Sequence, residues 1–309
     1  MRNRFHFKYF RSNLQRKLDN FRVHLSRPDA ILPLSILGLI AGIFAAITII
    51  ALRLLVDYAQ TTLYPMDTPD DFSSLSLQMR FATAVVGGIL VGVLFRFTAS
   101  RTHTVGLVHI LERLAYHQGR LPKKNALIQF IGGAITMIAG HSVGREGPSA
   151  HLGAASSNLP AQAVDLPNNS LRVLAACGAA AGIAASFNTP LAGAAFAMEV
   201  LLMEYTVAGF APIILATVSA TALTRLVFGN DLAYNVPSFA LGSLKELPFI
   251  LICGIVIGLL AATFNFLFRW VSINGGQLPD WLRPVIAGTL VGVCGAFAPE
   301  IMGMGDQTV

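Results

Sequence analysis

Charged residues are scarce in this sequence. Only 12% of its 309 residues are Asp, Glu, Lys or Arg and 54% are hydrophobic, whereas a soluble globular domain carries about 25% charged residues. Cysteine is scarce too, and Cys177, Cys253 and Cys294 lie inside apolar runs without CxxC spacing, which is typical of small buried hydrophobic residues. The sequence also lacks a nucleophile elbow, a P-loop lysine and a dinucleotide fingerprint. We therefore expect neither an enzyme nor a protein with a cofactor.

Long apolar runs dominate the sequence instead. The first is an uncharged stretch at 31–52, closed by Arg53, and a helix of that length spans a hydrocarbon core of about 30 Å. It exceeds the apolar region of about 7–15 residues found in a cleaved signal peptide. Further runs lie at 81–95, 125–144, 173–198, 205–224, 247–268 and 284–299. The pattern predicts an all-α, polytopic membrane protein.

Several of these runs do not read as simple spans. Small residues fill 174–187, and small side chains let helix backbones approach closely in lipid. The run at 173–198 is interrupted at Asn188-Thr189-Pro190, and the run at 125–144 contains the pair Gly132–Gly133. Short, interrupted apolar segments indicate discontinuous helices whose ends meet at a binding site. The sequence therefore favours a channel or transporter over a passive anchor.

The net charge of +6 belongs to one short arm. Residues 1–30 hold eight Lys or Arg against Asp19 and Asp29, so this arm carries 8 − 2 = +6 and the remaining chain 14 − 14 = 0. A basic arm could bind nucleic acid. Because this one leads directly into an apolar run, we interpret residues 1–30 as a cytoplasmic N-terminal segment that lies near membrane lipids, and expect no nucleic-acid partner.

The histidines do not show the spacing of a metal site. Three of them, His103, His109 and His117, precede the run at 125–144, and His141 and His151 flank the GREG stretch. No pair shows zinc-ligand spacing with carboxylate support. We expect hydrogen-bonded histidines at a rim, and no metal.

Glu146 is the most unusual residue in the chain. It lies between two long uncharged runs, where a charged side chain costs about 2.5–3.5 kcal/mol on insertion scales. Gly144 and Gly147 leave the backbone amides bare, and Pro148 suits the first turn of a helix, whose free N–H groups form an anion site. Glu146 could fill that site as a tethered anion and leave it on protonation. Alternatively, it pairs with Arg145 or caps the helix structurally.

The motif GREGP at 144–148, followed by GAAAGIAASFNTPLAGAAFAMEV at 178–200, closely resembles the CLC family of chloride channels and chloride/proton exchangers. The resemblance covers most of the chain, and two motifs in this order are specific to the family. It implies discontinuous, tilted helices in inverted repeats, and a homodimer with a separate pore in each subunit. It also implies that Glu146 is the gating glutamate and that Gly144, Arg145, Gly147 and Pro148 surround the outer anion site.

Two positions depart from the family pattern. The first filter segment usually reads GSGIPE, whereas HTVGLVH at 103–109 keeps Gly106 and places Val105 at the serine position, with Thr104 beside it. The resemblance assigns these three residues to anion binding, through backbone amides. In exchangers, a second glutamate on the proton route follows a first one directly. The corresponding pair here is Glu199 and Val200, and valine at that place favours a passive channel.

The C-terminal motif GAFAP at 295–299 fits the family's second filter pattern, GxFxP. It follows too soon after the preceding segments and lacks a Gly/Ser-rich lead-in. We interpret it as the end of a span that runs into a loop, and expect the second filter and the pore tyrosine beyond Val309. Residues 31–309 would then be an incomplete CLC-type transmembrane domain, with the first repeat and the start of the second.

These observations predict chloride-selective transport through a gated pore, with a passive, voltage- or pH-gated channel favoured. A chloride/proton antiporter, a transporter of small organic anions and a membrane scaffold that carries no ion are the alternatives. We expect a homodimer in a bacterial inner membrane with a cytoplasmic N-terminus.

Overall fold

The structure is a computed structural model, which describes residues 16, 19–25, 30–66, 68–203, 207–230 and 246–303. Helices and turns make up these residues, and no strand occurs among them. Five of the described helices are long and apolar enough to cross a membrane, as the apolar runs predict. The main helices are α2 (Ile31–Leu63), α3 (Leu77–Phe97), α4 (Gly106–Tyr116), α5 (Lys123–Ile138), α6 (Glu146–Ala163), α7 (Asn168–Phe187), α8 (Pro190–Phe196), α9 (Val207–Phe228), α10 (Leu247–Gly275) and α11 (Leu282–Phe297).

Helix α2 is longer than its apolar run. The run closes at Arg53, but the helix continues to Leu63. The guanidinium of Arg53 lies 4.1 Å from the ring centroid of Phe228 and its Nε lies 3.7 Å from Oδ2 of Asp57, one turn further along. A charge ends an apolar run without ending a helix, because an intrahelical partner and an aromatic face can accommodate it.

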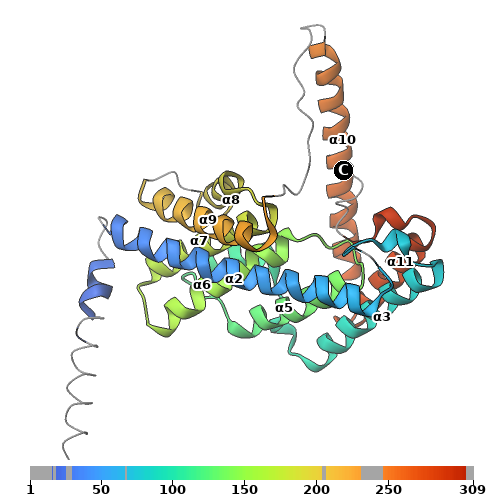
Figure 1. The fold of residues 1–309 in the computed structure, drawn as a ribbon, viewed down its shortest axis with the longest axis horizontal. Coiled ribbons are helices and arrows are strands. Elements are labelled where there is room, and N and C mark those ends of the chain that lie inside the picture. Colours follow the sequence, from blue (N-terminus) through green and yellow to red (C-terminus); the bar gives the residue numbers. More distant parts are fainter. Residues whose placement is uncertain are drawn as a thin grey trace, which may run out of the picture.

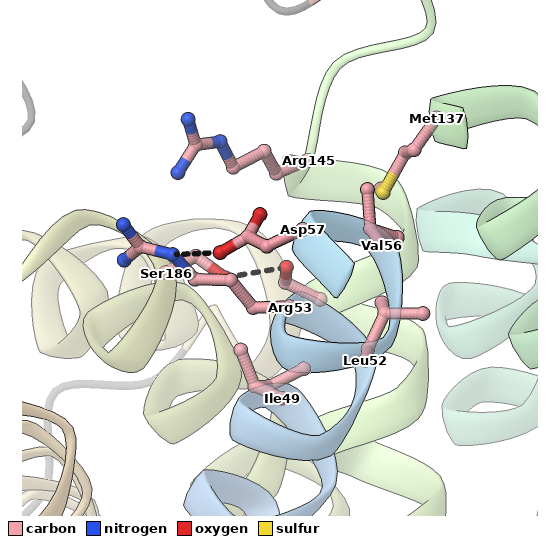
Figure 2. A pocket seen from close by; sticks show the side chains of 9 residues that line it. Ile49, Leu52, Arg53, Val56, Asp57, Met137, Arg145 and Ser186 are labelled. Carbon is pink, nitrogen blue, oxygen red and sulfur yellow. Dashed lines mark hydrogen bonds and ion pairs between the residues drawn. The ribbon is translucent and has the colours of Figure 1, made fainter. Parts of the chain in front are cut away.

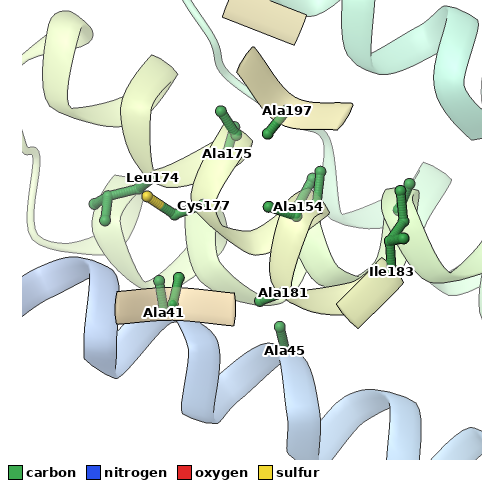
Figure 3. Packing of buried hydrophobic residues seen from close by; sticks show 14 of the residues in the cluster. Ala41, Ala45, Ala154, Leu174, Ala175, Cys177, Ala181, Ile183 and Ala197 are labelled. Carbon is green, nitrogen blue, oxygen red and sulfur yellow. The ribbon is translucent and has the colours of Figure 1, made fainter. Parts of the chain in front are cut away.

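Helix α7 forms the centre of the core. It packs against α6, α9, α2 and α8, and alanines from several of these elements meet there (Figure 3). A Cβ added at Gly178 would overlap the carbonyl oxygen of Gly153 on α6. The backbones of α6 and α7 therefore approach as closely as small residues allow, which is the packing mode expected of helices in lipid.

Two other helices, α3 and α11, form a second closely packed pair. A Cβ at Gly288 would lie 2.6 Å from the carbonyl oxygen of Ala84. Helix α10 stands apart from the rest of the molecule over most of its length (Figure 1), and none of its residues is buried. Its exposed side chains are mainly apolar, as suits a helix in contact with lipid or with further protein.

The described part of the N-terminal arm packs against the end of α6. Residues 19–25 are helical, and both Nε and one terminal nitrogen of Arg22 donate hydrogen bonds to the carbonyl oxygen of Val164, at 3.1 and 2.8 Å. A guanidinium at this position complements the negative end of the α6 dipole. Most of the predicted basic segment 1–30 lies outside the described residues.

Candidate anion site

The first turn of α6 carries Glu146. Gly144 has a φ of +66°, which turns the chain so that α6 begins at Glu146, and the amide of Ser149 donates the first helical hydrogen bond to the carbonyl of Arg145, at 2.9 Å. The side chain of Glu146 is exposed and folds back over Gly144, since a Cβ at Gly144 would lie 3.1 Å from Oε2. The carboxylate thus lies beside the helix N-terminus that would attract a free anion.

The start of α4 carries the other predicted anion-binding residues. Val105 is the extended N-cap of α4, and Gly106, with a φ of +77°, is its first residue. The side chain of Asn125 on α5 donates hydrogen bonds to the carbonyl oxygens of Thr104 and Arg101, at 2.8 and 3.2 Å. Asn125 therefore fixes the loop that leads into α4. Sequence reasoning missed this role, because an asparagine in an apolar run belongs to no local motif.

The N-terminal turns of α4 and α6 lie close together. His109 on α4 and His151 on α6 are joined by a hydrogen bond of 3.0 Å. A Cβ built at Gly106 or at Gly147 would meet no atom within 4 Å, so there is open space beside both helix ends. Pro148 lies in the first turn of α6, as predicted, where it is buried and lies under 4 Å from the Cβ position of Gly133 on α5. Its contribution is to pack the first turn of α6 against α5.

The loop before Glu146 is held from two sides. Nε2 of His141 donates a hydrogen bond of 2.8 Å to the carbonyl oxygen of Ala84 on α3. The hydroxyl of Ser142 donates a hydrogen bond to the carbonyl oxygen of Ile301. The amide of Gly303 donates one to the carbonyl oxygen of Gly140. Helix α11 ends at Phe297, and a 3₁₀ turn, Pro299–Ile301, follows. GAFAP is thus the end of a helix that runs into a short turn, as interpreted from the sequence, and the residues after it brace the loop of the site.

A pocket adjoins Arg145 (Figure 2). In it the carboxylate of Asp57 pairs with Arg53, and Arg145 lies nearby and also attracts that carboxylate. The hydroxyls of Ser149 and Ser186 share a hydrogen bond of 2.6 Å at the pocket wall. The two guanidinium groups place positive charge beside the site, which attracts anions. Sequence reasoning missed the place of Arg53 and Asp57 beside the site, because they come from α2, 91 and 87 positions before GREGP.

The predicted proton-route positions lie on a separate element. Glu199 and Val200 belong to a π-helical segment, η3 (Ala197–Leu202), in which Glu199 is exposed and Val200 half-buried. This segment packs against α4, α7, α8 and α9. The expected interruption before it is confirmed: Asn188 ends α7 in the left-handed conformation, with a φ of +57°, and α8 begins at Pro190. Single π turns inside helices are frequent at functional sites.

The expectation that the histidines lie at a rim is wrong for three of them. His109, His141 and His151 are buried, because each bonds across to a neighbouring element or lies in the α4–α6 contact. His103 is half-buried, stacks on Phe95 with ring centroids 4.3 Å apart and hydrogen-bonds to Asp280. Among the described residues, no group of three or more His, Cys, Asp or Glu is placed to hold a metal ion.

Solved structures share this fold. A slow cyanobacterial Cl-/H+ antiporter superposes with a TM-score of 0.70 at 24% identity, over 91% of this chain and 66% of that one. A CLC-type fluoride/proton antiporter superposes with a TM-score of 0.71 at 20% identity, over 91% of this chain and 70% of that one.

Sequence comparisons give the same relationship. A protein of Ralstonia nicotianae named as ClcB-like is 29% identical over 236 residues, which are 74% of this chain and 55% of that protein. The voltage-gated ClC-type chloride channel ClcB of Escherichia coli is 30% identical over 247 residues, which are 77% of this chain and 57% of that protein. The chain thus spans little more than half the length of these relatives. Residues 87–309 match the family model described as voltage gated chloride channel, and the chain therefore belongs to the CLC family.

Proposed function

We propose that the protein conducts chloride across a membrane through a CLC-type pore, with Glu146 as its gate. The observation that carries this proposal is the position of the Glu146 carboxylate, which folds back over Gly144 at the first residue of α6. The first turn of α4 lies nearby, held by the His109–His151 hydrogen bond. Each helix end presents unpaired N–H groups and roughly half a positive charge. This is a place where a chloride ion and a carboxylate compete.

The gate works by exchange of one anion for another. While ionised, Glu146 occupies the positive region as a tethered anion and blocks it. When protonated, the side chain loses its attraction to the helix N-terminus and moves away, so that chloride can enter. Gly106 and Gly147 leave room for the ion, since neither carries a side chain into the open space. Chloride is the transported ion, and no cofactor takes part.

Val200 supports a passive channel. Its side chain cannot hold a proton, so η3 offers no titratable group at that position. A chloride/proton antiporter is the second candidate. It is favoured by Glu199, the residue before Val200 on the same π-helical segment. The exposed carboxylate of Glu199 could accept the proton instead.

We further propose a homodimeric assembly in a bacterial inner membrane, with the basic arm in the cytoplasm. The charge asymmetry between residues 1–30 and the neutral remainder supports this orientation. The five spanning-length helices, together with the apolar exposed surface of α10, support an integral position in lipid.

The gate is tested by chloride efflux from liposomes that contain the complete protein. In the wild type, efflux should rise as the external pH falls, because protonation of Glu146 opens the gate. Glu146→Gln mimics the protonated side chain, so it should give high efflux at every pH. Glu112→Gln, which changes an exposed carboxylate on a different helix, α4, should behave like the wild type. Efflux from Glu146→Gln that keeps the wild-type pH dependence would refute the gate.

Coupling is tested separately. Chloride running downhill should move no protons against a pH gradient. Measurable uphill proton movement would reject the channel in favour of the antiporter, and Glu199→Gln would then show whether Glu199 carries the proton.

A further inference from the structure

A chain of three polar side chains connects α4 to α6 beside the anion site. Nε of Arg113 donates a hydrogen bond of 3.1 Å to Nε2 of His109. Nδ1 of His109 lies 3.0 Å from Nε2 of His151. Both histidines are only 1% exposed, and their ring centroids lie 5.2 Å apart.

Arg113 determines the protonation of both rings. A guanidinium can only donate, so Nε2 of His109 must be the acceptor and its proton must lie on Nδ1. Nδ1–H of His109 then donates to Nε2 of His151, which places the proton of His151 on Nδ1. A second proton on either ring would set two donors against each other. The contact therefore exists only between neutral rings in this pair of tautomers.

The contact lies beside the two helix ends that form the anion site. His109 is the fourth residue of α4 and His151 the sixth of α6. Side chains in a helix lean toward its N-terminus, so each ring covers the turn before its own Cα. The hydrogen bond thus joins the first turn of α4 to the first turn of α6.

Apart from the hydrogen bonds that hold the loops before α4 and α6, the site has little that could set its width. Gly106 and Gly147 contribute no side chain, and the space at their Cβ positions is open. Val105, at the start of α4, has no hydroxyl with which to contact an anion. The distance between two sets of backbone N–H groups therefore decides which anion can bind to both.

We infer that the His109–His151 hydrogen bond, with its direction set by Arg113, fixes the separation of the α4 and α6 N-termini and so determines the size of small monovalent anion that the pore accepts. This inference rests on the proposed function. His109 and His151 are positioning residues, since they act through the backbone amides of the first turns. Nδ1–H of His151 is a buried donor with no partner among the described residues. A buried donor without a partner is unfavourable. Apolar packing alone would therefore not explain a histidine at this position.

The test compares the relative initial uptake of chloride, bromide and nitrate by liposomes that contain the complete protein. His151→Leu removes the acceptor, so the two helix ends lose their link, and nitrate uptake relative to chloride should rise several-fold. His151→Gln supplies a carbonyl oxygen that can accept a hydrogen bond from Nδ1–H of His109. It should therefore restore the wild-type ratio of nitrate uptake to chloride uptake. His117→Leu makes the same change at an exposed residue at the far end of α4 and should leave the order unchanged.

A purely structural contact would lower the unfolding temperature of His151→Leu and leave the relative anion rates as in the wild type, which would overturn the inference. If His151→Gln raised nitrate uptake relative to chloride as much as His151→Leu does, the inference would be overturned as well. If His151→Leu does not fold, Arg113→Met, at a half-buried position, removes the donor that selects the tautomer. Arg113→Met should also raise nitrate uptake relative to chloride, by a smaller factor. An unchanged ratio would count against the inference.

The two proposals fail in different ways. Loss of the Glu146 gate would appear as pH-independent chloride efflux in the wild type or as pH-dependent efflux in Glu146→Gln. Normal gating at Glu146 together with unchanged anion order in His151→Leu would reject only the role of the histidine pair.

Discussion

Gly144→Ala should perturb both the backbone and the gate. Gly144 has a φ of +66°, and an L-residue in the left-handed region costs about 1–2 kcal/mol. The new Cβ would also lie 3.1 Å from Oε2 of Glu146, which is tighter than an ordinary contact. The carboxylate is at the end of a flexible side chain, so it can yield by a few tenths of an ångström, and the variant should fold.

The expected result has two parts. The free energy of unfolding should fall by about 1–2 kcal/mol from backbone strain alone. In addition, the displaced carboxylate should lose part of its attraction to the α6 N-terminus, so the gate should open at a higher pH than in the wild type. Chemical unfolding in detergent measures the first part, and chloride efflux against pH measures the second.

Two other glycines are matched controls. Gly106 also has a positive φ, +77°, but a Cβ there meets nothing within 4 Å. Gly106→Ala should therefore cost a similar backbone strain and narrow the space for the anion, without contact with Glu146. Gly147 lies in the helix with open space at its Cβ position. Gly147→Ala should therefore be neutral or stabilising by up to about 1 kcal/mol, while its methyl group hinders the anion and weakens chloride binding.

The reasoning would be refuted by either of two results. Gly147→Ala that destabilises as much as Gly144→Ala would show that the strain argument is wrong. Gly106→Ala that shifts the gate as far as Gly144→Ala would show that contact with Glu146 is not the cause.

Two further predictions concern packing and charge. Gly178→Ala should lower the free energy of unfolding by about 1–3 kcal/mol, because its Cβ would overlap the carbonyl oxygen of Gly153. Gly258→Ala on α10, where a Cβ meets nothing within 4 Å, should leave the free energy of unfolding unchanged. Equal unfolding midpoints of the two variants in detergent would contradict this prediction. The hydrogen bond with His103 lowers the pKa of Asp280, in the connection between α10 and α11, so this carboxyl stabilises the fold above its unfolded pKa of about 3.9 and loses that effect as pH falls through its lower folded pKa. Asp280→Asn should accordingly unfold at a lower temperature than the wild type at neutral pH, and the difference should shrink in acid; a difference that does not change with pH would count against it.

Local rules predicted much of the fold and part of the site. Hydropathy located each of the long apolar helices that the described residues form, because the energy of leaving water depends on side chains. The break at Asn188-Thr189-Pro190 followed from residues that favour turns and helix starts. Glu146 stood out because a carboxylate between apolar runs is costly, and Gly144 because a residue without a side chain leaves the neighbouring backbone amides bare.

The sequence by itself determined the helical class, the membrane environment and the position of the carboxylate beside a helix N-terminus. Only the tertiary structure decided that α2 continues past Arg53, where Phe228 receives the guanidinium, and that His109 and His151 are buried partners instead of rim residues. The physical reason is range: hydropathy and capping act within a few residues of the chain. The contacts that align two helix ends join residues tens of positions apart, and they form only when whole helices pack.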